Sequence, residues 1–222
     1  MFKKILILED IDCISIGVNA LLIENFSFEI QTAKYCDDAY LKIKKAIIDN
    51  TPFDLIITDL SFKNDPSRDT QIATGEALIK RMRDEDIHTK IIVYSVEDKP
   101  YLIRSLFSKN AVSGFVVKGR ESSNELVEAV IETAKGGIYI SPEFASVLNQ
   151  QSLFEIDMYD VEILKLLSEG FAQDDISRIF KQKEYPSPST SSIEKKINRL
   201  KYALKANNSI HLVAIAKNMR IV

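Results

Sequence analysis

The sequence of 222 residues has few cysteines, histidines, glycines and prolines, no tryptophan and no long apolar run. Its two cysteines, Cys13 and Cys36, and two histidines, His88 and His211, are spaced for neither a zinc site, nor a disulfide framework, nor a catalytic triad. No apolar segment approaches the roughly 18 to 20 residues of a membrane span, and the N-terminus reaches an acid too early for a signal peptide. With 45% hydrophobic and 27% charged residues, the composition is typical of a soluble globular protein. We therefore expect a cytoplasmic location and no membrane partner.

Charge is distributed unevenly along the chain, whose formal net charge is -3. Residues 150–222 contain eleven Lys or Arg and nine Asp or Glu, a net of +2, which leaves -5 for residues 1–149. Within residues 181–205, seven Lys or Arg stand against Glu184 and Glu194. A basic segment beside an acidic domain indicates that the two parts of the chain have different functions, and that the C-terminal part binds a polyanion such as nucleic acid. Charge alone is also compatible with a solvated helix face that has no partner.

The first part of the chain alternates short apolar runs with longer helical patterns. Five runs predict strands at Lys4–Leu8, Phe28–Ala33, Asp54–Thr58, Lys90–Ser95 and Ser113–Lys118. Apolar residues at helical spacing predict helices near residues 12–25, 36–49, 74–84, 99–109 and 121–135. This alternation predicts an α/β fold with a doubly wound, five-stranded parallel sheet covered on both faces. In such a sheet, ligands bind beyond the carboxyl ends of the strands.

Polar residues follow or close four of these strands: Glu9 and Asp10 the first, Asp59 the third, Ser95 the fourth and Lys118 the fifth. Three convergent acids suit a hard divalent cation such as Mg²⁺, which prefers oxygen ligands. Lys118 and the cation would offset the charge of an incoming phosphoryl group, to which Ser95 would donate a hydrogen bond. Asp59 is then the expected nucleophile, because a carboxylate can carry a phosphoryl group covalently. Each residue alone also fits a strand-end cap or a surface ion pair.

Residues 1–122 resemble the receiver domain of two-component response regulators, with the fifth helix reaching residue 136. The resemblance rests on the order and spacing of four motifs, ILILED, IITDLS, IIVYS and GFVVKG. It implies a flavodoxin-like receiver in which Asp59 accepts a phosphoryl group from a sensor histidine kinase. Ser95 and Lys118 would be its catalytic partners.

The same resemblance implies a magnesium site and a switch. Asp10, Asp59 and the main-chain carbonyl of Ser61 would hold the metal, and Glu9 would act through water. The hydroxyl of Ser95 and the ring of Phe115 would be the switch residues. A half-buried phenylalanine in a strand is an equally ordinary interpretation of Phe115.

The sequence departs from the receiver pattern at two places. The family commonly has Met-Pro three and four residues after the acceptor, whereas this chain has Phe62 and Lys63, followed by a longer polar loop through residue 74. An extended loop here is similar to that of the capsule-synthesis regulators of the family. Gly119 replaces the usual proline after the lysine, which removes the expected cis peptide. Neither departure removes a catalytic oxygen or charge, so phosphorylation remains the expectation.

The second part of the chain is predicted to be helical. Residues 137–152 contain two glycines and a Ser-Pro pair and predict a linker, after which residues 153–222 predict an all-α domain. Four helices are expected there, the first after an Asp157 cap through Gly170 and the others at Ala172–Phe180, Ser191–Leu204 and Ser209–Met219.

These helices resemble the helix-turn-helix of LuxR-type (NarL/FixJ family) output domains, and VEILKLLSEGFAQDDISRIF carries the first two. The resemblance implies that the Ser191–Leu204 helix enters the DNA major groove. The DNA-binding candidates are Ser192, Glu194, Lys195, Lys196, Arg199 and Lys201. The preceding segment, KQKEYPSPSTS, is longer than the compact turn of the family. It could hold the recognition helix in place, add an arm that contacts phosphates, or signify that DNA reading has been lost.

The sequence therefore predicts a phosphorylation-dependent transcription factor and not an enzyme. Its expected cofactor is Mg²⁺, and its expected partners are DNA, a sensor histidine kinase, a second copy of the chain and, as a further candidate, RNA polymerase. The alternative keeps the receiver but makes the helical domain a protein-binding adaptor or an output used without phosphorylation. A haloacid-dehalogenase-like phosphatase would need a general acid where Ser61 stands. A flavodoxin-like carrier would need a Ser/Thr/Gly phosphate cradle where Glu9 and Asp10 stand.

Overall fold

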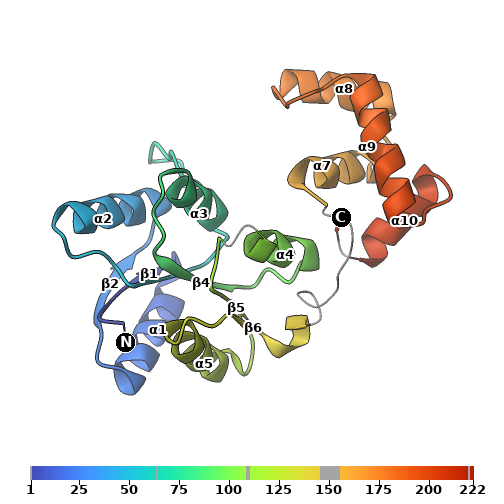
Figure 1. Cartoon of the computed structure of the whole chain (residues 1–222). Helices are drawn as coiled ribbons and strands as arrows, with labels where there is room; N and C mark the ends of the chain where they lie inside the picture. Colours follow the sequence, from blue (N-terminus) through green and yellow to red (C-terminus); the bar gives the residue numbers. More distant parts are fainter. Residues whose placement is uncertain (1, 64, 109–110, 146–155, 220) are drawn as a thin grey trace. The chain divides into compact units, whose positions relative to one another are not determined.

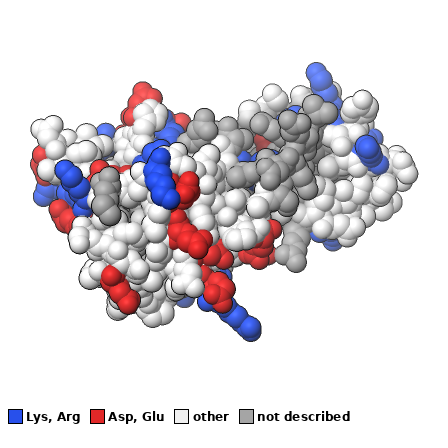
Figure 2. Space-filling view, turned by 60° about the horizontal axis from the view of Figure 1, so that its bottom comes forward, with Lys and Arg blue, Asp and Glu red and all other residues white. Residues whose placement is uncertain are grey.

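The computed structural model describes residues 2–63, 65–108, 111–145, 156–219 and 221–222. The chain divides into two compact units, an α/β unit and a helical unit (Figure 1). None of the described helices has the length and apolar character needed to cross a membrane. On the face shown in Figure 2, most acidic side chains lie over the α/β unit, in line with the negative balance of residues 1–149.

The α/β unit is built on a parallel sheet with the order β2-β1-β3-β4-β5-β6. Its strands are β1 (Lys4–Leu8), β2 (Glu29–Ala33), β3 (Leu55–Thr58), β4 (Lys90–Ser95), β5 (Gly114–Val117) and β6 (Tyr139–Ile140). Consecutive residues of β1 and β3 are buried because helices cover both faces of the sheet. The strand order reverses at β1, which has β2 on one side and β3 on the other. Ligand sites of such folds lie beside this reversal, at the carboxyl ends of the strands.

Helices cover the two faces of this sheet, as predicted. Figure 1 shows α1 (Asp12–Asn25) and α5 (Ser122–Ala134) on one face, and α2 (Cys36–Ile48) and α3 (Gly75–Asp84) on the other. Helix α4 (Pro100–Ser108) connects β4 to β5, and its predicted end at residue 109 lies outside the described residues. On the α1 side, alternate strand residues such as Ile5, Ile57 and Val116 share one core cluster with Leu22 and Leu126. The α/β fold with a parallel sheet is therefore confirmed.

A sixth strand corrects the predicted count of five. Strand β6 lies within residues 137–152, which we predicted as a linker, and it pairs in parallel with β5. The N–H of Tyr139 donates to the Ser113 carbonyl at 3.1 Å, and the N–H of Ser141 donates to the Phe115 carbonyl at 2.9 Å. A short 3-10 helix, η1 (Pro142–Phe144), follows. The remainder of the predicted linker, residues 146–152, lies outside the described residues.

Local chemistry explains how the chain returns to β5. Gly136 adopts a φ of +87°, a left-handed conformation that favours glycine and lets the chain turn back after α5. The Ser141 hydroxyl then accepts a hydrogen bond from the Val117 N–H at 3.0 Å and donates one to the Glu125 carboxylate. Because two residues are too few for a periodic pattern, β6 could not be recognised from hydrophobic spacing.

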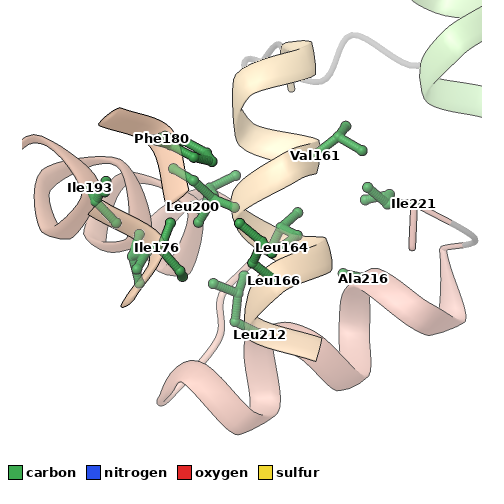
Figure 3. Close-up of a cluster of buried hydrophobic side chains, with 12 residues drawn as sticks. Val161, Leu164, Leu166, Ile176, Phe180, Ile193, Leu200, Leu212, Ala216 and Ile221 are labelled. Atoms are coloured by element: carbon green, nitrogen blue, oxygen red, sulfur yellow. The ribbon is translucent and has the colours of Figure 1, made fainter. Parts of the chain in front are cut away.

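The helical unit contains α7 (Met158–Ser168), α8 (Gln173–Gln182), α9 (Thr190–Ala203) and α10 (Ser209–Asn218). Asp157 caps α7, as predicted: its carboxylate accepts a hydrogen bond from the Asp160 N–H at 2.7 Å, and the Asp160 carboxylate accepts one from the Asp157 N–H at 3.0 Å. Apolar side chains from all four helices point toward one another in a single core (Figure 3). Ile193, Ile197 and Leu200 lie on one face of α9 and are buried in this core.

The long segment between α8 and α9 is a packed turn. The ring of Tyr185 stacks on Phe180 with centroids 4.5 Å apart, and Tyr159 contacts Phe180 edge-on at 4.8 Å. The Tyr159 hydroxyl donates to the Ser187 carbonyl at 2.9 Å. Aromatic packing therefore ties the additional residues to the core of the helical unit.

Candidate functional site

The carboxyl ends of four strands bring Glu9, Asp59, Ser95 and Lys118 together. The sheet ladder continues into these residues, because the Asp59 N–H donates to the Leu8 carbonyl at 3.1 Å and the Lys118 N–H donates to the Ser95 carbonyl at 2.8 Å. Their backbones are therefore held by the sheet, and the side chains meet at one edge of it.

Asp59 is surrounded by hydrogen-bond donors. Its Oδ1 accepts hydrogen bonds from the Ser95 hydroxyl at 2.5 Å, the Leu60 N–H at 2.5 Å and the Ser61 N–H at 3.2 Å. Its Oδ2 is paired with Lys118. Only 5% of Asp59 is exposed, and a carboxylate so buried is costly unless donors and a cation compensate it. These contacts supply that compensation and fix the orientation of the carboxylate.

Lys118 links Asp59 to Glu9, whose Oε2 lies 2.6 Å from its Nζ. Burial alone would lower the pKa of Lys118, but the hydrogen bonds and charges of Asp59 and Glu9 outweigh burial and raise that pKa. Burial raises the pKa of Glu9, while the hydrogen bond and charge of Lys118 act in the opposite direction. Lys118 therefore stays cationic between two buried acids.

Asp10 lies outside this ion-pair network. It is half-buried, and its Oδ2 accepts a hydrogen bond from the main-chain N–H of Lys63 at 2.9 Å. In the described part of the chain, no three acidic, histidine or cysteine side chains form a ready metal-binding group. Glu9, Asp10, Asp59 and the Ser61 carbonyl nevertheless offer the oxygen donors that suit Mg²⁺.

Gly75 lies close to the backbone of Asp59 and Leu60. A Cβ atom on Gly75 would lie 1.9 Å from the carbonyl oxygen of Asp59, and the Gly75 N–H donates to the Leu60 carbonyl at 3.0 Å. Thr74 caps α3 here by accepting a hydrogen bond from the Ala77 N–H at 3.1 Å. We did not predict a site role for Gly75 from the sequence. The available signal was its position at the start of a predicted helix.

The predicted switch aromatic is a core residue of the sheet. Phe115 is fully buried, on the opposite face of β5 from Val116. After Lys118, Gly119 occupies the place of the usual proline, and the described residues contain no cis peptide bond.

The predicted DNA-binding residues of α9 fall into two groups. The first group consists of the exposed Glu194 and Lys195 and the half-buried Ser192 and Lys201. The second group consists of Lys196 and Arg199, which form ion pairs with acids at the start of α7.

The ion pairs of the second group centre on the buried acid Asp160. Lys196 Nζ lies 2.8 Å from Asp157 Oδ2 and 3.2 Å from Asp160 Oδ1, and Arg199 pairs with Asp160. Burial raises the pKa of Asp160. Burial would also raise the pKa of Asp157, but hydrogen bonds from Lys196 and the Asp160 N–H lower it. Lys196 and Arg199 therefore compensate acids within the fold.

The outer face of α9 includes residues that sequence reasoning missed. Asn198 and Tyr202 follow Lys195 at helical spacing and are exposed, Tyr202 to 90%. A shallow groove of about 440 Å³ lies beside Lys195, and its other walls include Tyr159, Pro186 and Ser187. Both side chains lie at helical positions opposite the buried residues of α9, so the sequence spacing could have predicted their exposure.

Known structures resemble the whole chain. No protein-family model matches the sequence. The RcsB response regulator of Salmonella typhimurium is similar over 97% of this chain and 99% of its own, with a TM-score of 0.65 and 19% identity. RcsB dimers bound to DNA give a TM-score of 0.61 at 20% identity, over 97% and 98% of the two chains. A LuxR-family two-component response regulator from Aurantimonas sp. SI85-9A1 is similar over 69% of this chain and 100% of its own, with a TM-score of 0.56 and 18% identity.

The chain has the fold of a two-component response regulator. Among curated proteins, the probable transcriptional regulatory protein SgaR of Hyphomicrobium methylovorum is 25% identical over 155 residues, or 70% of this chain and 67% of SgaR. The resemblance to response regulators that we inferred from the motifs is confirmed as a fold across both units.

Proposed function

We propose that the protein is a phosphorylation-dependent response regulator that accepts a phosphoryl group on Asp59 and controls transcription by binding DNA. The observation that carries this proposal is the Asp59 carboxylate, buried at the carboxyl end of a parallel sheet between Ser95 and Lys118. The names of the similar proteins support the same role, because SgaR is called a transcriptional regulatory protein and RcsB is described bound to DNA.

In the proposed reaction, one carboxylate oxygen of Asp59 bonds to phosphorus as the phosphorus–nitrogen bond of a phosphohistidine donor breaks. The N–H groups of Leu60 and Ser61 and the hydroxyl of Ser95 hold the carboxylate in one orientation. Lys118 offsets the charge of the phosphoryl oxygens, an electrostatic contribution that is strongest in a buried site. A histidine kinase is the proposed donor.

The proposed metal holders are Asp10, Asp59 and the Ser61 carbonyl, with Glu9 acting through water. Their oxygen donors fit Mg²⁺, and the acids Glu9 and Asp59 share the positive charge of Lys118. When bound, Mg²⁺ would supply further positive charge that stabilises the transferred phosphoryl group.

For the output, we propose that α9 enters the DNA major groove as the recognition helix of a helix-turn-helix. Lys195 and Lys201 are the proposed phosphate contacts, and Glu194 and Ser192 of the same helix are the proposed contacts to base edges. A homodimer and RNA polymerase are further proposed partners of this output.

The acceptor is tested with acetyl phosphate and Mg²⁺, with the added phosphoryl group read by intact mass. We expect Asp59→Asn to abolish labelling, because the amide lacks the nucleophilic carboxylate. Asp54→Asn is the matched control, because Asp54 lies at the opposite end of the same strand, where it accepts hydrogen bonds from the Lys3 and Lys4 N–H groups. Wild-type labelling of Asp59→Asn would show that the acceptor is another residue.

The alternative output is a protein-binding adaptor. Lys196 and Arg199 pair with Asp157 and Asp160, which leaves fewer cations of α9 for DNA. Titration of DNA with the full chain at several salt concentrations separates the two functions. A DNA-binding output predicts an affinity that falls steeply with salt as phosphate contacts release counterions. No binding at low salt, with or without phosphorylation, would favour the adaptor.

A further inference from the structure

The main chain that follows Asp59 contacts Asp10 directly. The N–H of Lys63 donates a hydrogen bond to Asp10 Oδ2 at 2.9 Å, and the contacts of the described residues leave Asp10 Oδ1 without a hydrogen bond. We propose that the Lys63 N–H is a positioning group that orients Asp10 for a divalent cation, an inference that rests on the proposed function. It fixes one carboxylate oxygen and leaves the other available to the metal.

The loop that presents this N–H is clamped onto the first turn of α2. The Asp37 carboxylate accepts hydrogen bonds from the Gln71 N–H at 3.2 Å and the Ile72 N–H at 3.1 Å. The side chain of Ile72 is buried, with 8% exposure. The far end of the loop is thus fixed by main-chain hydrogen bonds and by an apolar anchor.

A second set of contacts holds the middle of the loop. Arg68 forms a 2.8 Å ion pair with Asp38, and its guanidinium lies 3.9 Å from the centre of the Tyr35 ring. The Tyr35 hydroxyl donates to Asp65 Oδ2 at 3.1 Å. The Arg68–Asp38 ion pair is partly exposed, so screening by solvent limits its contribution.

The loop ends where Gly75 meets the backbone of Asp59 and Leu60. The described residues of this loop, 62–63 and 65–74, are therefore tied to the acceptor strand, to α2 and to Asp10. This arrangement gives a function to the sequence departure at position 63, because a proline there would have no N–H to donate. The polar loop and the replacement of proline act together in holding Asp10.

The size of the effect follows from the general behaviour of metal ligands. Ligating carboxylates are themselves hydrogen-bonded, and loss of such outer partners lowers metal affinity by about 10- to 100-fold. Mg²⁺ demands near-ideal geometry and uses few protein ligands, so a misoriented Asp10 would weaken binding directly.

The first test compares Lys63→Pro, which removes the N–H, with Lys63→Ala, which keeps it and removes only the side chain. Mg²⁺ affinity is measured by calorimetry, and acetyl phosphate labelling is followed against Mg²⁺ concentration. In Lys63→Pro we expect Mg²⁺ binding about tenfold weaker, with the labelling rate recovered at saturating Mg²⁺. Lys63→Ala should match the wild type in both measurements.

A second pair of variants keeps the N–H and loosens the loop instead. Asp37→Ala removes the acceptor of Gln71 and Ile72, whereas Asp38→Ala removes an acid from the same helical turn but leaves those hydrogen bonds intact. We expect Asp37→Ala to accelerate hydrogen exchange at the amides of Lys63, Gln71 and Ile72 and to weaken Mg²⁺ binding severalfold. Asp38→Ala should change both much less.

The outcomes separate this inference from the proposed function. A wild-type protein that neither binds Mg²⁺ nor accepts phosphate would overturn the proposed function. A functional wild type with unchanged or tighter Mg²⁺ binding in Lys63→Pro would overturn only the positioning role. A lower maximal labelling rate at an unchanged Mg²⁺ half-saturation would also overturn it, because that pattern indicates general disruption. If Lys63→Pro does not fold, the Asp37 and Asp38 pair decides.

Discussion

Individual residues at the strand ends balance burial against charge. Lys118 compensates Glu9 and Asp59, both nearly inaccessible to water. A buried acid that loses its cation is strongly destabilising, because the remaining charge has neither solvent nor partner. Lys118, the proposed catalytic lysine, is therefore also a residue on which stability depends.

We expect Lys118→Met to lower the free energy of unfolding by about 3–5 kcal/mol, because it leaves two acids without their cation. Urea denaturation measures this loss, and added Mg²⁺ should restore part of it. Lys135→Met is the control, because Lys135 is largely exposed and its pairing with Glu132 is on the surface. Equal stability of the two variants would contradict a stabilising role of Lys118.

Gly75 and Gly17 are two glycines at which an added methyl group should have opposite effects on stability. Gly75→Ala places a Cβ against the Asp59 carbonyl, so we expect a loss of about 1–3 kcal/mol in unfolding free energy from overpacking. Gly17 lies within α1 and a Cβ there would meet nothing within 4 Å. Gly17→Ala should therefore stabilise the protein by up to about 1 kcal/mol, as alanine does in helices. Thermal unfolding of both variants checks the opposite signs.

At the scale of elements, α9 combines a stabilising role with a proposed binding role. Lys196 and Arg199 compensate the fully buried Asp160, whereas Lys195 and Asn198 face solvent. The helix therefore separates the two roles by position, and substitutions along it should have different effects.

We expect Lys195→Ala to weaken DNA binding and to lower the salt slope by about one, with stability unchanged, because a phosphate contact is lost. Lys196→Ala should instead lower the melting temperature, since it removes a partner of Asp157 and Asp160. DNA titrations at several salt concentrations and thermal unfolding give the two readouts. Equal effects of both variants on stability and binding would contradict this separation.

The helices and strands also show which parts of the structure could be predicted from the sequence. Long apolar periods predicted the parallel sheet and its helices, and Asp157 was recognisable as a cap because a capping residue acts on its own helix. Strand β6 could not be predicted, since Tyr139 and Ile140 pair with β5 only through tertiary contacts. The pairing of Arg199 with Asp160 and of Lys63 with Asp10 likewise joins residues far apart in sequence, and composition carries no signal for either.

For the molecule as a whole, phosphorylation is expected to act through assembly. The phosphoryl group would draw Ser95 and Lys118 toward Asp59 and bias the surrounding surface between two states. Two linked output units reading two half-sites gain effective concentration, so their affinity rises without new base contacts.

We therefore expect beryllium fluoride, as a phosphoryl mimic, to shift the protein from monomer toward dimer in sedimentation. DNA with two half-sites should then be bound more tightly than DNA with one. Asp59→Asn is the control and should show neither change. Full occupancy by the mimic without any change in mass or affinity would exclude phosphate-driven dimerisation.

Strand β6 has a consequence for where the chain can be cut. A fragment ending at residue 136 would lack the partners of the Ser113 and Phe115 carbonyls and would leave a bare sheet edge along β5. Bare edges recruit strands from other molecules, so this fragment should aggregate on storage. A fragment ending at residue 145 retains β6 and should stay dispersed in light scattering. Work on the isolated α/β unit should therefore use the longer fragment, because self-association of the shorter one could be mistaken for regulated dimerisation.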